Sequence, residues 1–302
     1  MKRDKIAFIV EGTKTEPELI SKSLNNVYFA KNQIDLIILP TGMNIYNLFL
    51  LMKDDDLDII TLIKEQAQKL QSKKVKKFNQ SLDLSSLQQS DFSSVYLFFD
   101  YDTHQDNLPR NIDRHTVIKE MLMTFNNETE NGKLYISYPM VEAIKDFEEI
   151  NSFPQRNFLL IEDGIRYKNL LSASSSHLDF KNYTKQLWDY LITIYIIKIH
   201  YIFNMEIDNN YLLESTKKAS TLSIYMNVLK KYDIPFSCIP ILSAFPEFIL
   251  DYFTINFIFE NIEIDSHLLN QFQLFKLQCD QDIKNLSISS EIDNSEAGYY
   301  NR

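Results

Sequence analysis

The first half of the chain repeats one pattern, in which short uninterrupted apolar runs are separated by amphipathic stretches. The runs cover residues 6–10, 34–39, 95–99 and, more weakly, 133–137, with a fifth candidate at 158–161. Runs of this length without polar alternation are typical of strands that are buried on both faces. Because parallel strands need crossover connections, helices are expected between them. We therefore expect an α/β fold with a Rossmann-like, mostly parallel sheet flanked by helices.

Helical patterns fill the gaps between these runs, at residues 16–25, 46–70, 112–125 and 140–149. Thr15 followed by Glu18 matches a capping box, and Pro17 lies in the first turn, where proline is tolerated. The second half has long helical patterns at 183–203, 211–231 and 246–260, and a polar end after Asp282 that we expect to be mobile. We expect an α/β domain at 1–165, with a helical insertion at about 45–94, and a mostly helical domain at 166–302.

Charge limits the partners that the chain can bind over its whole surface. The 302 residues include 31 Lys and Arg against 41 Asp and Glu, which gives a formal net charge of -10. A protein that coats nucleic acid without specificity is normally basic. A polyanionic partner must therefore meet a local basic patch or a bound metal ion.

Cysteine content and hydropathy indicate a reducing, aqueous environment. Cys238 and Cys279 are the only cysteines, too few for a disulfide scaffold or a zinc cage. The most apolar long run, 187–203, is interrupted by Asp189, Lys198 and His200, which favours a buried helix over a membrane span. We expect a soluble cytoplasmic protein with no membrane partner.

Acidic residues follow three of the predicted strands. Glu11 comes directly after the first run and Glu16 opens the next helix; Asp100 and Asp102 follow the third run, and Glu142 lies just beyond the fourth. In an open parallel sheet, functional groups collect beyond the carboxyl ends of the strands. Carboxylates gathered there repel one another unless a cation lies between them, and Mg²⁺ or Mn²⁺ prefers such oxygen ligands. The alternative for each element alone is a solvated loop, or acidic residues that favour a helix N-terminus.

Two segments resemble one known family. Ile9-Val-Glu-Gly-Thr-Lys-Thr-Glu16 and Phe98-Phe-Asp-Tyr-Asp102 are similar to the glutamate and Asp-x-Asp motifs of the Toprim domain of topoisomerases, primases and nucleases. The second acidic residue of the first motif resembles the nuclease branches, which include the overcoming-lysogenisation-defect and RloB-like groups. Ser137-Tyr-Pro-Met-Val-Glu142 resembles an element of the RloB-like group. Length and a helical second half are similar to the Toprim effectors of the PARIS anti-phage system.

The resemblance implies a metal-dependent nuclease toxin that cuts RNA such as tRNA, or DNA, and is held in check by an ABC-type ATPase partner. Because nucleases that cut structured polynucleotides often work as symmetric pairs, we expect a homodimer, with the helical half at 166–302 selecting the substrate or forming the dimer. It implies that Glu11, Asp100 and Asp102 are catalytic. The same three residues would bind Mg²⁺ or Mn²⁺, with Glu16 and Glu142 completing the metal site.

Basic residues near these motifs are candidates for contacts with substrate phosphates. They are Lys14, between the two glutamates of the first motif, His104, just after the Asp pair, and a run made up of Lys73, Lys74, Lys76 and Lys77. A plain loop histidine and a solvated lysine run are the competing interpretations.

Two other functions stay open. One is a Toprim-like binding or assembly module that has lost turnover. The other is a primase-like nucleotidyl transferase or a topoisomerase, although strand passage needs a nucleophilic tyrosine and large gating domains, for which 302 residues leave little room.

Overall fold

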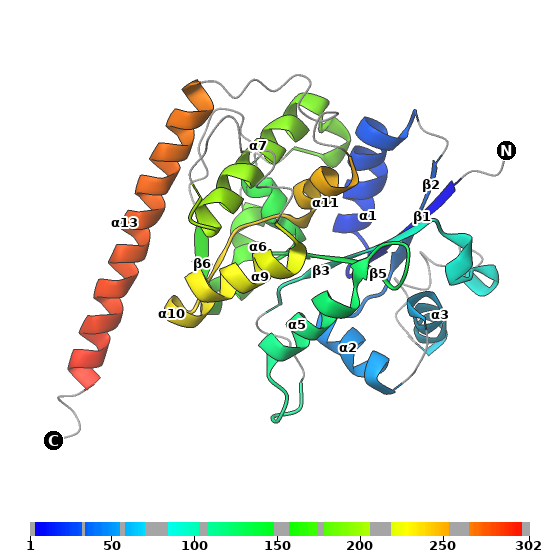
Figure 1. Cartoon of the computed structure of the whole chain (residues 1–302), viewed down its shortest axis with the longest axis horizontal. Helices are drawn as coiled ribbons and strands as arrows, with labels where there is room; N and C mark the ends of the chain where they lie inside the picture. The colour runs from blue at the N-terminus through cyan, green and yellow to red at the C-terminus, as the bar shows by residue number, and fades with distance from the viewer. Residues whose placement is uncertain are drawn as a thin grey trace.

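The structure is a computed structural model of the chain, shown in Figure 1. It describes residues 4–31, 34–54, 58–69, 84–102, 108–147, 157–173, 178–205, 219–253 and 266–297.

A five-stranded sheet lies at the centre of the molecule. In spatial order its strands are β2 (Ile34–Pro40), β1 (Asp4–Val10), β3 (Ser94–Asp100), β5 (Gly132–Ser137) and β4 (Asn126–Asn127). All neighbouring strands are parallel except β4, which runs antiparallel to β5. The strands expected at 6–10, 34–39, 95–99 and 133–137 are confirmed, and the mostly parallel α/β architecture with them.

Helices connect the strands along the chain. They are α1 (Thr15–Leu19) with the π-helical η1 (Ile20–Phe29), α2 (Ile45–Asp54), α3 (Ile59–Lys69), the short 3₁₀ turns η2 (Leu84–Ser86) and η3 (Gln89–Asp91), α5 (Arg114–Thr124) and the 3₁₀ helix η4 (Val141–Phe147). The pattern expected at 46–70 is therefore two helices.

The capping box expected at Thr15 is wrong. Lys14 occupies the N-cap position of α1 without a side-chain cap, and Thr15 is already the first helical residue. The Thr15 hydroxyl instead donates to Oε1 of Glu142, 3.2 Å away. A tertiary partner has thus replaced the local bond that the sequence pattern favours.

The second half of the chain is mostly helical. Its elements are η5 (Ile161–Asp163), α6 (Gly164–Ala173), η6 (Phe180–Asn182), α7 (Lys185–Ile202), α9 (Thr221–Val228), η7 (Leu229–Asp233), α10 (Ile234–Phe236), α11 (Ala244–Tyr252) and α13 (Ser266–Ala297). The end after Asp282 therefore belongs to a helix as far as Ala297. β6 (Phe158–Leu160) pairs antiparallel with β7 (Cys238–Pro240) in a separate two-stranded sheet, so the run at 158–161 is a strand but not part of the parallel sheet.

Aromatic side chains bind the second half to one face of the main sheet. Phe8, Phe98 and Tyr135 stack in a row across β1, β3 and β5, with ring centroids 5.7 and 5.4 Å apart. Phe245 of α11 stacks on Phe98 at 4.6 Å, and Phe248 meets Phe8 edge-on at 5.4 Å. Such pairs add to the stabilisation that burial gives.

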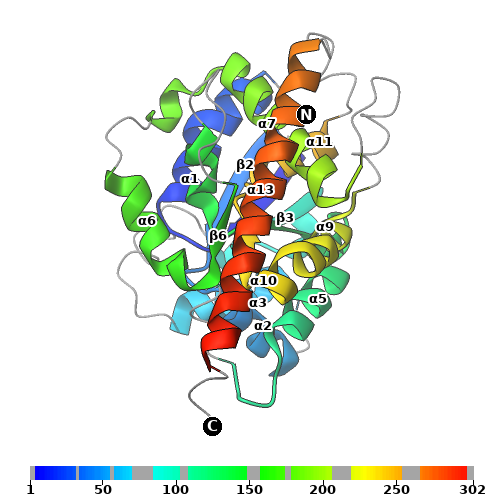
Figure 2. The same ribbon diagram turned by 90° about the vertical axis from the view of Figure 1, so that its left-hand side faces the viewer.

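The sheet is thus covered on both sides. Figure 1 shows α1, α7 and α11 on one side and α2, α3 and α5 on the other. Figure 2 shows α13 crossing the face of the molecule that carries α10 and β6. The domain boundary at 165/166 stays a prediction, although buried residues of both halves belong to one hydrophobic cluster.

Both cysteines are free and buried. Among the residues that the structure describes, no helix combines the length and apolar character needed to cross a membrane.

Candidate functional site

The site begins where the order of strands reverses. β2 and β3 lie on opposite sides of β1. The chain therefore passes from β1 to β2 on one side and later crosses to β3 on the other. In open α/β sheets such a switch point opens a crevice at the carboxyl ends of the strands. Glu11 follows β1 and Asp100 ends β3 at this switch point, and we call the region around these two residues the crevice. The Glu11 N–H donates to the Phe98 carbonyl (3.2 Å), and Glu11 Oε2 accepts from the backbone N–H of Asp100 (3.2 Å).

Asp100 is linked in turn to the next strand. Its Oδ1 accepts a 2.8 Å hydrogen bond from the N–H of Val141, the first residue of η4. η4 follows β5 after the cis Tyr138–Pro139 peptide, and places Glu142 beside the Thr15 hydroxyl of α1. Three strand ends and the first helix therefore meet at one point.

Glu16 reaches the same point through the turn at Gly12. Its Oε1 accepts from the Gly12 N–H at 2.8 Å. A Cβ added at Gly12 would lie only 2.5 Å from Glu16 Oε2. A side chain at this position would displace the Glu16 carboxylate, so the glycine leaves the space that this carboxylate occupies.

Burial and mutual repulsion set the electrostatics of the site. Burial, followed by the charges of Glu16 and Asp102, raises the pKa of Glu11 to about 8. Burial and the charges of Glu11, Glu16 and Glu142 raise the pKa of Asp100 well above its ordinary value. The pKa of Glu16 is raised by burial and by Glu142. The carboxylates predicted from sequence therefore act on one another across the crevice, which is the condition that a cation would relieve.

Lys168 of α6 is a site residue that the sequence did not reveal. Its Nζ lies 2.9 Å from Glu142 Oε1, with the Glu142 side chain 9% exposed and that of Lys168 62% exposed. Partial burial opposes its charge, but the hydrogen bond to Glu142 and the charges of Asp100 and Glu16 raise the pKa of Lys168. The Tyr167 hydroxyl holds α6 against η4 by donating to Asp146 at 2.6 Å. No motif marks Lys168, because only the packing of α6 brings it to the crevice.

The donor set suits a hard divalent cation, since it consists of carboxylate oxygens whose charges repel. Within the described part of the chain, however, no group of His, Cys, Asp or Glu side chains forms a ready-made cage for a metal ion. The carboxylates instead accept hydrogen bonds from the backbone or pair with Lys168. The residues that would hold the ion are Glu11, Glu16, Asp100, Asp102 and Glu142.

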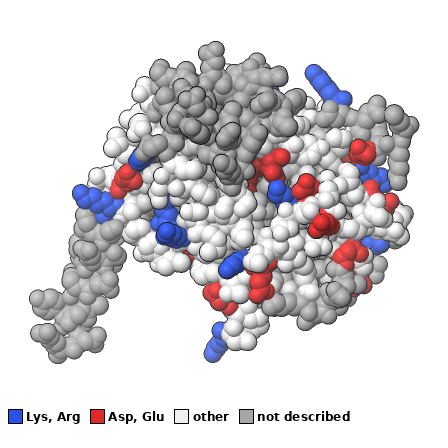
Figure 3. Space-filling model, in the orientation of Figure 1, with Lys and Arg blue, Asp and Glu red and all other residues white. Residues whose placement is uncertain are grey.

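The candidate substrate residues are only partly placed. Lys14 is exposed at the N-cap of α1, between Glu11 and Glu16 in the sequence. The other candidates, His104, Lys73, Lys74, Lys76 and Lys77, lie outside the described residues. Figure 3 shows one face of the molecule, on which the basic and acidic side chains of the described residues are interspersed without a continuous basic surface.

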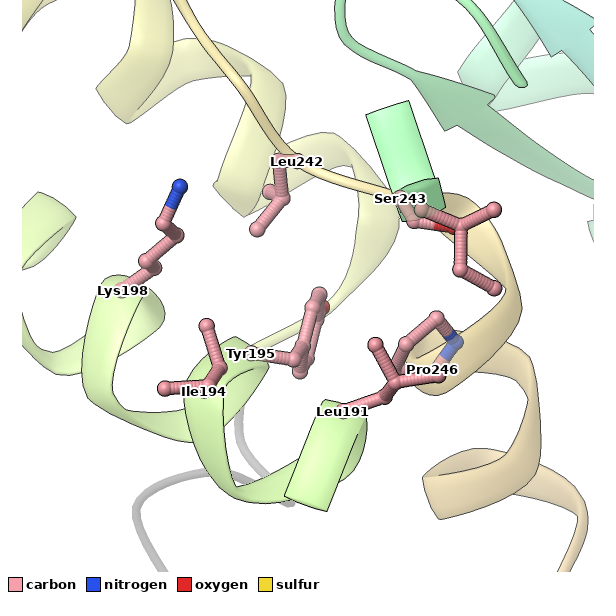
Figure 4. Close-up of a pocket in the computed structure, with 8 residues that line it drawn as sticks. Leu191, Ile194, Tyr195, Lys198, Leu242, Ser243 and Pro246 are labelled. Carbon is pink, nitrogen blue, oxygen red and sulfur yellow. The ribbon is translucent and has the colours of Figure 1, made fainter. Parts of the chain in front are cut away.

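A small cavity lies in the helical half. It is lined by Ile144 of η4, by side chains of α7 that include Tyr195 and Lys198, and by Leu242, Ser243 and Pro246 (Figure 4). Burial lowers the pKa of Lys198 to about 7, and its ammonium donates to the Ile241 carbonyl at 2.7 Å. The cavity has a volume of about 10 Å³, which is enough for about one water molecule. It is too small for an organic ligand, so the crevice at the strand ends is the better candidate site.

Comparisons with family models, with curated proteins and with solved structures found no match for this chain.

Proposed function

We propose that the chain is a divalent-metal-dependent phosphodiesterase of the Toprim type, an endonuclease that cuts RNA such as tRNA. The main support is the contact of Glu11 Oε2 with the backbone N–H of Asp100, which brings together two acidic motifs far apart in the sequence. Other acidic residues lie near this pair. The charges of Glu16 and Asp102 raise the pKa of Glu11, and those of Glu16 and Glu142 raise the pKa of Asp100.

A bound Mg²⁺ or Mn²⁺ would neutralise charge on the phosphodiester and lower the pKa of a water molecule. The protein's own residues would supply the geometry. The Val141 N–H fixes Asp100, the Gly12 N–H fixes Glu16, and Glu11 is placed between them to handle a proton. Among the described residues, Lys14 is exposed within the first acidic motif, and Lys168, which pairs with Glu142, is largely exposed; we propose both for contact with a phosphate. A local contact is needed, because a net charge of -10 does not attract a polyanion to the whole surface.

The biological role that we propose is that of an anti-phage toxin in the cytoplasm, held inactive by an ABC-type ATPase and active as a homodimer. It rests on the motif resemblance. Induced expression of the parent chain is expected to arrest growth, and Glu11→Ala to abolish the arrest. A partner ATPase gene expressed with the parent chain is expected to restore growth.

The direct test incubates purified protein with tRNA, mixed RNA and DNA, with Mg²⁺, with Mn²⁺ and with EDTA. Cleavage is expected only with metal, and Asp100→Asn is expected to lower its rate by about 10³-fold, since several kcal/mol of charge stabilisation are lost. Asn at this position relieves repulsion, so the metal-free variant should unfold at a higher temperature than the parent, which verifies that it is folded.

Glu18→Gln is the control, because Glu18 lies on α1 as Glu16 does, but pairs with Lys22 in solvent. Its cleavage rate should equal that of the parent. The proposal is wrong if Asp100→Asn cleaves as well as the parent, or if no polynucleotide is cut under any metal condition.

One observation favours a second function, a binding module without turnover. Lys168 already supplies a positive charge to Glu142, and the described carboxylates form no metal cage. Mn²⁺ binding without cleavage of any polynucleotide would support this second function.

A further inference from the structure

The residue between the two aspartates of the Asp-x-Asp motif is anchored in the helical half. Tyr101 is fully buried, and its hydroxyl donates to Oδ2 of Asp233 at 2.5 Å. Asp233 ends η7 and is itself 6% exposed. Tyr101 of the Asp-x-Asp motif thus contacts Asp233, a carboxylate of the helical half that belongs to none of the acidic motifs.

Arg114 completes this buried group. Located at the first position of α5, it places Nη2 3.1 Å from both oxygens of Asp233. Its guanidinium also lies over the Tyr101 ring, 5.9 Å from the centroid. Asp233 therefore holds one hydroxyl and one guanidinium, which come from the two chain segments that border the 103–107 connection.

Further bonds tie the neighbouring strand end to the same region. The Tyr101 N–H donates to the Ser137 carbonyl at 2.9 Å, and its ring lies 5.3 Å from that of Tyr138. Tyr138 and Leu242 exchange two backbone hydrogen bonds of 2.8 Å, and the Ala244 N–H donates to the Ser137 hydroxyl. The loops that carry Asp100 and Glu142 are both held by residues 233–244.

The ion pair of Arg114 with Asp233, whose side chains are 19% and 6% exposed, is an inefficient source of stability. Desolvation of the two charges offsets much of their attraction, and apolar replacements of similar volume are often neutral or stabilising. The position of this ion pair, in contact with the middle residue of the Asp-x-Asp motif, explains its presence better than a gain in stability does. The Tyr101 hydroxyl points to Asp233, whereas Asp100 and Asp102 on either side of it both act on Glu11, so fixing Tyr101 limits the directions that its two neighbours can take.

We propose that Tyr101, Asp233 and Arg114 form a positioning clamp that orients the carboxylates of Asp100 and Asp102 for metal binding. The clamp rests on the proposed function and extends the site into the helical half. Groups that orient metal ligands affect affinity and rate although they touch neither metal nor substrate.

The test is Tyr101→Phe in the full-length protein, which removes the hydroxyl and leaves Asp233 paired with Arg114. Mn²⁺ affinity, measured by electron paramagnetic resonance, and kcat for RNA cleavage are each expected to fall by about tenfold. KM for RNA should stay within about twofold of the parent, since the clamp does not contact the polynucleotide. Asp233→Asn, which also removes the charge that pairs with Arg114, should lower both quantities at least as much.

Tyr201→Phe is the matched control. It removes a tyrosine hydroxyl that likewise donates to an aspartate, Asp280, at 2.8 Å, in a partly buried bond between α7 and α13. Its Mn²⁺ affinity and kcat should equal those of the parent.

The possible results distinguish failure of the clamp from failure of the endonuclease proposal. Parental Mn²⁺ affinity and kcat in Tyr101→Phe would overturn the clamp alone, and so would equal losses in Tyr101→Phe and Tyr201→Phe, which would indicate a general effect of lost packing. If the parent binds Mn²⁺ but cuts nothing, the endonuclease proposal fails and the affinities still decide the clamp. A parent that neither binds Mn²⁺ nor cuts overturns both.

Discussion

Two regions of the molecule each hold a glutamate whose pKa burial raises to about 8, and they differ in the charged groups around that glutamate. Glu11 is raised by burial and by Glu16 and Asp102, in a crevice where it accepts a backbone hydrogen bond. Glu247 of α11 is raised by burial and by Asp251, while Lys133 and a hydrogen bond with Tyr195 lower it. Its Oε1 has no hydrogen-bond partner among the described residues.

Glu11 and Glu247 differ in what can neutralise the charge around them. Glu247 carries one excess charge among tyrosines, and a single proton removes it. At Glu11 the repulsion is shared by carboxylates from separate strands and helices, so one divalent cation relieves several groups together. A raised pKa by itself therefore does not mark a site, whereas convergence of acidic side chains from different elements does.

Metal-dependent stabilisation should separate the two regions most strongly. We expect Mg²⁺ or Mn²⁺ at about a hundred times its Kd to stabilise the parent by about 2.7 kcal/mol, seen as a rise in the unfolding midpoint. The rise should be larger at pH 8 than at pH 6, because bound protons must leave the carboxylates first. Glu11→Gln should lose most of it and Glu247→Gln none. Equal responses of the two variants would contradict a metal site at Glu11.

The pH dependence of stability without metal should isolate Glu247. Its pKa is higher in the folded than in the unfolded state, so its contribution favours folding below pH 4.5 and is lost as pH rises towards 8. One such group lowers the free energy of unfolding by about 1.4 kcal/mol per pH unit in that window. Urea unfolding of Glu247→Gln in EDTA, between pH 5.5 and 7.5, should show a slope shallower by about this amount. A slope equal to the parent's would mean that Glu247 is not buried as a neutral acid.

The strands and the meeting of Glu11 with Asp100 could be predicted, because both follow from local patterns. Apolar runs specify buried parallel strands, and neighbouring parallel strands end at one edge. Lys168 and the Asp233 clamp could not, because packing of α6 and η7 brings them in from distant parts of the chain. The capping box predicted at Thr15 is wrong for the same reason, since the Thr15 hydroxyl donates to the distant Glu142 instead of forming a local cap. The run at 158–161 has the composition of a buried strand, but composition does not specify which sheet it joins.

Replacement of Lys168 is expected to have the smallest effect of these changes, and it tests whether Glu142 is a metal ligand. Lys168→Met keeps the aliphatic stem and removes the charge beside Glu142. Because Lys168 is largely exposed, the metal-free protein should lose less than about 1 kcal/mol of stability. If Glu142 is a metal ligand, the lysine competes with the ion, and Mn²⁺ affinity of the variant should rise by about two- to fivefold. Arg166→Met on the same helix, exposed to solvent, is the control and should leave affinity unchanged. Unchanged or weaker Mn²⁺ binding by Lys168→Met would remove Glu142 from the ligand set and restrict the metal to the β1–β3 side of the crevice.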